Sequence, residues 1–198
     1  MRVLVAGLGN MGLSHALAHH HHPEAEIVGL VNRSGRCDHP DLAPYPVYDD
    51  FYRALAATEP DLAVIATYSD SHADYACAAM EAGAHVFVEK PLATTVADAR
   101  RVVDCARRLK RKLVVGYILR HHPSWQRLIA EARALGGPYV FRLNLNQQSI
   151  GATWETHKQL MQTTPPIVDC GVHYVDVMCQ ITDAKPLRVH GMGLRLSD

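Results

Sequence analysis

Residues 2–12 read Arg-Val-Leu-Val-Ala-Gly-Leu-Gly-Asn-Met-Gly, and this stretch decides the fold. Its apolar first half is typical of a strand buried on both faces, and its second half has the spacing G-x-G-x-x-G directly before a helical pattern. In such a loop Gly7 permits a tight turn, Gly9 lets the backbone approach a pyrophosphate, and Gly12 lets the helix pack closely on the strand. The N–H groups that begin the helix then face the phosphates; a purely structural glycine turn is the alternative. We therefore expect a dinucleotide to bind at Gly7, Gly9, Asn10, Met11 and Gly12.

The residues that follow repeat the alternation of strand and helix. Up to residue 120, short β-branched runs alternate with longer segments of helical spacing, which is typical of a parallel sheet covered by helices. The expected strands are Arg2–Ala6, Glu26–Asn32, Leu62–Ala66, His85–Val88 and Leu113–Tyr117, and the expected helices are Met11–His19, Phe51–Ala57, Ser71–Ala82 and Val96–Leu109. Residues 1–120 are therefore predicted to form a doubly wound Rossmann domain of the α/β class.

The pattern changes after residue 120. A helix is expected at Pro123–Leu135, where Gly-Gly-Pro ends it. Beyond it we expect a strand at Tyr139–Asn146, a polar stretch at Gln147–Pro166, a helical segment around Ile167–Ile181 and a strand at Leu187–Leu196. Residues 121–198 are therefore predicted to form a partial α+β domain that binds the substrate.

Composition and charge argue against several classes of protein. The 198 residues contain 20 Lys+Arg and 20 Asp+Glu, so nothing favours nucleic acid or an anionic membrane as a partner. No apolar run approaches the ~20 residues that span a bilayer. The five cysteines form no C-x-x-C pair, which argues against disulfides and structural zinc and favours reduced thiols in the cytoplasm. We predict no metal site; the run His19–His22 is interpreted as a solvated helix end, with a metal site as the alternative.

The residues at the end of the second expected strand predict the type of dinucleotide. NAD enzymes commonly have Asp or Glu there, because a carboxylate accepts hydrogen bonds from the adenosine ribose. This chain has Asn32, Arg33 and Ser34 instead. The missing carboxylate removes repulsion against a 2′-phosphate, and the arginine and serine supply a charge and a hydroxyl to it. These residues favour NADP over NAD; the alternative is that Arg33 stacks on adenine and either cofactor is accepted.

Two further motifs carry residues suited to chemistry. Glu89 and Lys90 follow an expected strand, at the sheet edge where doubly wound folds bind ligands, although an ordinary surface pair is the alternative. Asp169, His173 and Asp176 have the spacing i, i+4 and i+7, so a helix would carry them as one polar stripe. The residues alone leave open a solvated stripe or metal binding by Asp and His.

In their order along the chain, these motifs resemble the glucose–fructose oxidoreductase/inositol dehydrogenase/rhizopine catabolism (Gfo/Idh/MocA) family. They are the glycine loop, residues 66–72, the Glu-Lys-Pro motif at 89–91, residues 116–120 and the stripe at 169–176. The resemblance implies that Lys90 lies beside the nicotinamide and the substrate, and that Asp169 and His173 act with it on a substrate hydroxyl. The expected cofactor contacts further include Ala66, Thr67, His72, Glu89 and Lys90, and the expected substrate contacts are Lys90, Arg120, Asp169 and His173.

The resemblance covers essentially the whole chain, with three departures. Tyr68 stands where the family commonly has proline, and Thr164-Pro165-Pro166 stand where glycines commonly precede the third motif. Family members are also usually much longer, so this chain is identified as a C-terminally short member.

The implied activity is hydride transfer between a nicotinamide cofactor and a sugar, cyclitol or related polyol. In that mechanism His173 accepts the hydroxyl proton, Lys90 stabilises the alkoxide, and Asp169 orients the substrate or the other two side chains. The resemblance also implies a homo-oligomer built through the sheet of the second domain. The alternatives are a nucleotide-binding regulatory or scaffold protein without catalysis, and a reductase or C–X hydrolase that uses the cofactor transiently.

Overall fold

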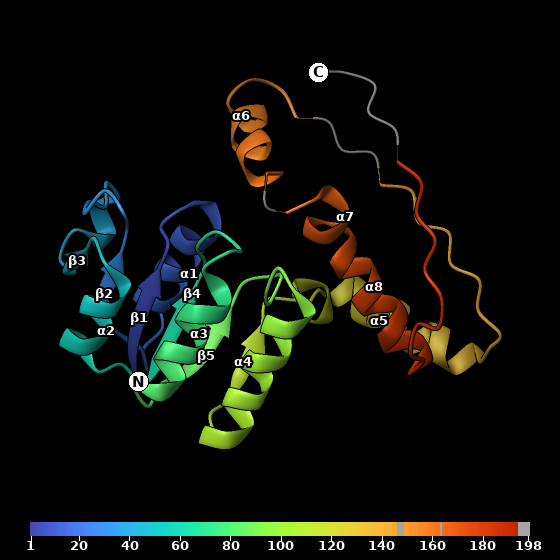
Figure 1. Ribbon diagram of the computed structural model, residues 1–198, viewed down its shortest axis with the longest axis horizontal. Coiled ribbons are helices and arrows are strands. Elements are labelled where there is room, and N and C mark those ends of the chain that lie inside the picture. The colour runs from blue at the N-terminus through green and yellow to red at the C-terminus, as the bar shows by residue number, and fades with distance from the viewer. Residues whose placement is uncertain (146–148, 163, 194–198) are drawn as a thin grey trace. The chain divides into compact units, whose positions relative to one another are not determined.

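The computed structural model describes residues 1–145, 149–162 and 164–193 (Figure 1). The chain divides into two compact units. The first consists of Met1–Tyr117 and Gln147–Val172, and the second consists of Ile118–Asn146 and His173–Asp198. Within the described ranges, none of the helices combines the length and the apolar character needed to cross a bilayer.

A six-stranded parallel sheet is the centre of the first unit. Its strands are β1 (Arg2–Ala6), β2 (Glu26–Val31), β3 (Val47–Tyr48), β4 (Leu62–Ile65), β5 (His85–Val88) and β6 (Leu113–Val115). Their order is β3-β2-β1-β4-β5-β6, so the winding of the chain reverses between β1 and β4. Ligands of doubly wound sheets bind at the carboxyl edge beside such a reversal.

The register of the strands brings the ends of five of them to one level at that edge. Ala6 lies opposite both Val31 and Ile65. Ile65 lies opposite Val88, which lies opposite Val115. The residues that follow these ends leave the sheet together, and they are Gly7, Asn32, Ala66, Glu89 and Gly116.

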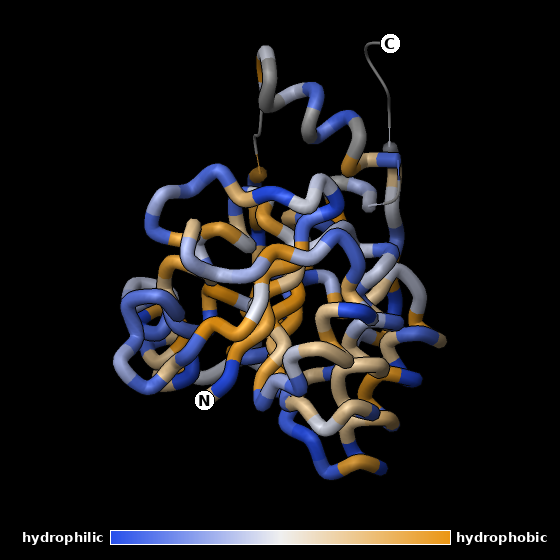
Figure 2. The backbone as a smooth tube through the Cα atoms, turned by 90° about the vertical axis from the view of Figure 1, so that its left-hand side faces the viewer, coloured by the Kyte–Doolittle hydropathy of each residue, from blue (hydrophilic) through white to orange (hydrophobic). Residues whose placement is uncertain are grey.

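Helices cover both faces of the sheet. They are α1 (Asn10–His20), the 3-10 helix η1 (Pro40–Leu42), α2 (Phe51–Thr58), α3 (His72–Glu81) and α4 (Val96–Leu109). Because successive residues of a strand point to opposite faces, Val3 and Val5 share a core cluster with Ala16 of α1, whereas Leu4 shares one with Phe51 of α2. Figure 2 shows the apolar segments, in orange, concentrated along the central strands. The prediction of an α/β Rossmann sheet is confirmed.

Most elements of the first 120 residues have nearly the predicted bounds. β1, β5 and α4 agree fully, and β2 and β4 each end one residue earlier than expected. β6 ends two residues early, at Val115. The first residue after each of these three strands still donates its backbone N–H to the neighbouring strand, and the loops of the carboxyl edge begin there.

The histidine run lies at the end of α1, which stops at His20. The Nδ1 atom of His20 is 2.9 Å from the hydroxyl of Tyr45. Burial, followed by the charges of two neighbouring histidines, lowers the pKa of His19. Desolvation therefore outweighs the helix dipole at this residue, because the dipole alone would favour the protonated form.

Three further helices follow in the second half of the chain: α6 (Gly151–Leu160), α7 (Pro166–Asp169) and α8 (Gly171–Thr182). The helical segment expected around Ile167–Ile181 is present but divided into two helices, because Cys170 separates α7 from α8. A Cβ atom on Gly171 would lie 2.7 Å from Cδ1 of Ile167, so this glycine allows the close turn between the two helices. Residues 147–166, which were expected to form a polar stretch, include the helix α6.

The second unit contains the 3-10 helix η2 (Ile118–Arg120), the helix α5 (Pro123–Leu135) and most of α8. Side chains of α5 hold the end of α8. Arg133 donates from Nη2 to the carboxylate of Asp183 at 2.8 Å and from Nε to the carbonyl oxygen of Gln180 at 2.6 Å. The rings of Trp125 and Tyr174 lie 6.0 Å apart between centroids. The predicted helix Pro123–Leu135 has the observed bounds.

The two strands predicted in this unit are not formed in its described residues. Residues 139–145 and 186–193 have no ladder partner, and Asn146 and residues 194–196 lie outside the described ranges. Their apolar side chains are exposed, for example Val140 and Leu187, each 97% exposed. Alternating apolar residues indicate the side-chain period of a strand, but a strand also needs a hydrogen-bonded neighbour, and an isolated pair is marginal in water.

Candidate active site

The glycine loop joins β1 to α1 at the carboxyl edge of the sheet. Gly7 has φ +88°, and a Cβ there would collide with the carbonyl oxygen of Ala66. A Cβ on Gly12 would collide with the carbonyl oxygen of Gly7, so only glycine fits at either position. The loop and the start of the helix are therefore packed directly on the end of β4.

Gly9 differs from the other two glycines because it faces open space. A Cβ there would meet no atom within 4 Å, and its φ of −71° is an ordinary extended conformation. Gly9 is the N-cap of α1 and brings no side chain to the first N–H groups of the helix. Asn10 and Met11 begin the helix in exposed positions. An accessible helix start with uncapped N–H groups fits the pyrophosphate of a dinucleotide.

The loop after β2 is closed by the side chain of Asn32. Its Nδ2 atom donates to Oγ of Ser34 at 2.9 Å and to the carbonyl oxygen of Arg36 at 2.7 Å. The N–H of Gly35 donates to the carbonyl oxygen of Asn32 at 2.7 Å. Arg33 is exposed on this turn, and its guanidinium carbon lies 5.3 Å from the ring centroid of Tyr68.

His72 connects the loops that follow β4 and β5. The residue is 1% exposed. Its Nδ1 atom lies 2.7 Å from the carbonyl oxygen of Pro91, and its Nε2 atom lies 3.1 Å from that of Thr67. This imidazole therefore fixes the two loops to each other, beside the glycine loop that Ala66 contacts.

Glu89 is a buried carboxylate, 6% exposed, at the end of β5. Its Oε1 atom is 2.8 Å from Nε2 of His15 in α1, and the N–H of Lys90 donates to Oε2 at 3.3 Å. A Cβ on Gly116 would lie 3.0 Å from the same carboxylate, so the glycine after β6 leaves room for it. Sequence reasoning missed His15, because its contact with Glu89 depends on how α1 packs on the sheet.

Lys90 is paired with Asp169. The Nζ atom lies 2.5 Å from Oδ1 of Asp169 and donates to the backbone carbonyl oxygen of the same residue at 3.0 Å. Both side chains are 20% exposed, so the pair is largely shielded from water. The thiol of Cys170 donates to Oδ2 at 3.5 Å. Burial, and then the charge of Asp169, raises the pKa of this thiol, which stays neutral and does not compete for the lysine.

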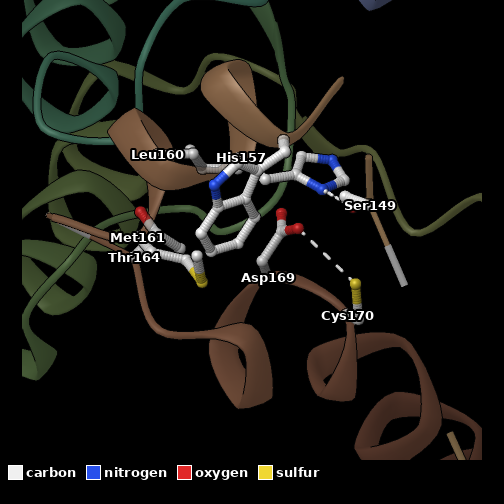
Figure 3. A pocket seen from close by; sticks show the side chains of 8 residues that line it. Ser149, His157, Leu160, Met161, Thr164, Asp169 and Cys170 are labelled. Carbon is white, nitrogen blue, oxygen red and sulfur yellow. Dashed lines mark hydrogen bonds between the residues drawn. The ribbon is translucent and has the colours of Figure 1, made fainter. Parts of the chain in front are cut away.

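Asp169 also lines a pocket of about 130 Å³ (Figure 3). In Figure 3 its carboxylate points into the space between His157 and Met161. His157 of α6 has Nδ1 2.5 Å from Oγ of Ser149. The pocket combines apolar and polar side chains, and its lining is Ser149, Trp154, His157, Leu160, Met161, Thr164, Asp169 and Cys170. One carboxylate thus belongs both to the ion pair of Lys90 and to the pocket wall.

The predicted stripe of Asp169, His173 and Asp176 on one helix was wrong. Asp169 is the last residue of α7, whereas His173 and Asp176 lie on α8 and in the second unit. Asp176 is bound by Arg120 in a bidentate ion pair, with Nε–Oδ2 2.9 Å and Nη2–Oδ1 2.5 Å. Arg120, which was expected to contact substrate, therefore holds a carboxylate of its own unit. Among the residues that the structure describes, no three His, Cys, Asp or Glu side chains are grouped to hold a metal ion.

The parallel sheet and the glycine loop at its carboxyl edge define a dinucleotide-binding domain of the Rossmann type. A sequence model of the Gfo/Idh/MocA family, described as "Oxidoreductase family, NAD-binding Rossmann fold", matches residues 1–117. The chain belongs to this family, and the resemblance seen in the sequence is confirmed.

The names of individual relatives refer to different substrates. The chain is 26% identical over 190 residues to an inositol 2-dehydrogenase of Paracoccus denitrificans, covering 92% of this chain and 54% of the relative. It is 31% identical over 169 residues to a 4-carboxy-2-hydroxymuconate-6-semialdehyde dehydrogenase of Sphingobium sp., covering 79% of this chain and 54% of the relative.

A solved structure shares the fold. Apo scyllo-inositol dehydrogenase from Lactobacillus casei superposes with a TM-score of 0.72 at 18% identity, over 92% of this chain and 55% of that one. At this identity the likeness concerns the fold alone. The chain spans about half the length of these relatives.

Proposed function

We propose that this chain takes part in hydride transfer between a nicotinamide dinucleotide and the carbinol carbon of a sugar, cyclitol or related polyol. The observation that carries the proposal is the Lys90–Asp169 ion pair, which lies at the carboxyl edge and shares Asp169 with a pocket. A shielded ammonium at this place stabilises the negative charge that develops on a substrate oxygen.

The residues at the carboxyl edge have separable roles in this proposal. A bound nicotinamide supplies the hydride acceptor. Lys90 binds the substrate oxygen and stabilises it as an alkoxide, while Asp169 holds the ammonium in place. His173 accepts the proton of the hydroxyl, since a neutral imidazole is a suitable base near neutral pH. Glu89 and His72 are positioning residues, because their buried side chains fix the loops that carry Lys90.

We propose NADP as the preferred cofactor. The turn closed by Asn32 presents Arg33 and Ser34 at the end of β2, and none of the three is a carboxylate that would repel a 2′-phosphate. Arg33→Ala should weaken NADP by about 1–3 kcal/mol and leave NAD nearly unchanged, the range of a charge-assisted contact. An equal loss for both dinucleotides would instead indicate that Arg33 stacks on adenine.

The pocket supports a ring-shaped polyol as substrate. Trp154, Leu160 and Met161 offer apolar walls to the C–H face of a ring, while Asp169 and His157 offer hydrogen bonds to hydroxyl groups. The names of the relatives in Paracoccus and Sphingobium support including both inositols and semialdehydes among the candidate substrates.

The direct test is a substrate panel of sugars, inositols and semialdehydes with either cofactor. Wild-type protein should reduce the cofactor with at least one compound, and Lys90→Met should lose this activity while still binding the dinucleotide. Lys112→Met removes an exposed ammonium and is the matched control. Tight cofactor binding without turnover on any compound would favour a regulatory or scaffold protein. Isotope exchange at the substrate carbon without net reduction would favour transient use of the cofactor.

We also propose that the second unit mediates self-association. Val140, Leu187 and Met192 are almost fully exposed, and exposed apolar side chains favour contacts between copies. Sedimentation of wild-type protein should show oligomers that Val140→Asp together with Leu187→Asp disrupts, whereas a monomer at all concentrations would contradict this proposal.

All five cysteines are free thiols, which supports a reducing location such as the cytoplasm.

A further inference from the structure

Arg33 and Tyr68 come from opposite sides of the glycine loop. Arg33 follows β2 and Tyr68 lies in the loop after β4, and these two strands flank β1 in the sheet. Their contact, with the guanidinium carbon 5.3 Å from the ring centroid, therefore crosses the carboxyl edge beside Gly7. This distance is within the range of a cation–π interaction.

The backbone of Tyr68 is held rigidly. Its carbonyl oxygen accepts hydrogen bonds from the N–H of Ser71 at 3.1 Å and from the hydroxyl of Ser71 at 2.8 Å. The preceding residue, Thr67, has Oγ1 2.6 Å from the same hydroxyl, and its carbonyl oxygen contacts the buried His72. The ring, which is 38% exposed, is thus attached to a well-held backbone at the carboxyl edge.

The side chain of Arg33 is held less rigidly than the backbone of Tyr68. The backbone of Arg33 belongs to the turn that Asn32 closes, but its side chain is exposed, and within the described ranges it forms no ion pair. A long arginine side chain loses much rotational freedom when it binds a phosphate, and contact with a fixed ring removes part of that loss in advance.

We propose that Tyr68 is a specificity-determining positioning residue that holds the Arg33 guanidinium for the 2′-phosphate of NADP. The inference rests on the NADP preference proposed above. A guanidinium stacked on an aromatic ring has one face covered, while its N–H edge stays free for bidentate hydrogen bonds to phosphate oxygens.

Calorimetric titration of NADP and NAD, without any substrate, tests the inference. Tyr68→Ala should weaken NADP about two- to fivefold, the size of an exposed cation–π contact, and leave NAD unchanged. Tyr68→Phe should bind both dinucleotides like wild type, because the contact uses the ring and not the hydroxyl. Tyr52→Ala removes another exposed tyrosine, 49% exposed in α2, and is the matched control.

A double-mutant cycle separates this inference from the cofactor preference itself. If Arg33→Ala selectively weakens NADP, Tyr68→Ala in that background should have no further effect. If Arg33→Ala is selective but Tyr68→Ala changes neither dinucleotide, or weakens both equally, the role of Tyr68 is refuted and the preference stands. If Arg33→Ala is itself unselective, the preference fails, and the inference with it.

Discussion

Replacing Gly9 with alanine separates cofactor binding from folding. The Cβ would meet no atom within 4 Å, and the φ of −71° suits alanine. Alanine is a clearly poorer N-cap than glycine, but it also reduces the freedom of the unfolded chain by a similar amount. These effects oppose each other, so we expect the free energy of unfolding to change by no more than about 0.5 kcal/mol.

The added methyl group would, however, occupy the space through which a pyrophosphate approaches the backbone. We expect the dinucleotide affinity of Gly9→Ala to fall at least about tenfold, or 1.4 kcal/mol. Gly12→Ala is the contrasting variant, because its Cβ would collide with the carbonyl oxygen of Gly7 and should lower stability by about 3 kcal/mol. Urea unfolding and cofactor titration measure the two quantities. A Gly9→Ala protein that binds the dinucleotide like wild type would refute the assignment of the loop.

Three further predictions follow from the contacts around the site. Gly116→Ala would place a Cβ 3.0 Å from the buried carboxylate of Glu89 and should lower stability by about 1–3 kcal/mol in urea unfolding; no loss would show that this carboxylate can shift. Asp169→Asn breaks a largely shielded ion pair and should cost about 1–3 kcal/mol, whereas Asp74→Asn, at an exposed pair, should cost less than about 1 kcal/mol, and equal effects would contradict the shielding. Burial, and then a neighbouring thiol, raises the pKa of Cys77 from 9.0 to about 11, so the folded state favours the neutral thiol. Stability should be full below pH 9 and fall as the pH rises toward 11 more than it does in Cys77→Ala, and parallel pH profiles of the two proteins would contradict this.

Sequence reasoning succeeded where the signal was local. The glycine loop, the strand before it and the helix after it lie within 20 residues, and the structure has each of them. Continuous apolar runs identified β1 and β4 as strands buried on both faces. The residues at the carboxyl edge could also be predicted from the sequence, because the residues that follow parallel strands lie at the same edge of a sheet.

The remaining features depend on contacts between distant residues. The alternation at residues 139–145 gave the period of a strand but not a neighbour to pair with it. The break at Cys170, which removes Asp169 from the helix of His173, follows from close packing at Gly171. Likewise, the pairing of His15 with Glu89 depends on how α1 lies on the sheet, which no spacing within either segment encodes.

The transfer of deuterium from substrate to nicotinamide most directly tests the proposed hydride transfer and its dependence on Lys90. Cyclitols and sugars deuterated at their carbinol carbons are incubated with the protein and oxidised NADP or NAD, and the reduced cofactor is examined by mass spectrometry. Wild-type protein should place deuterium on the nicotinamide with at least one compound, and Lys90→Met should still bind the dinucleotide but transfer none. Deuterium transfer by Lys90→Met at the wild-type rate, or tight dinucleotide binding by the wild type with no transfer from any polyol, would contradict the proposed function.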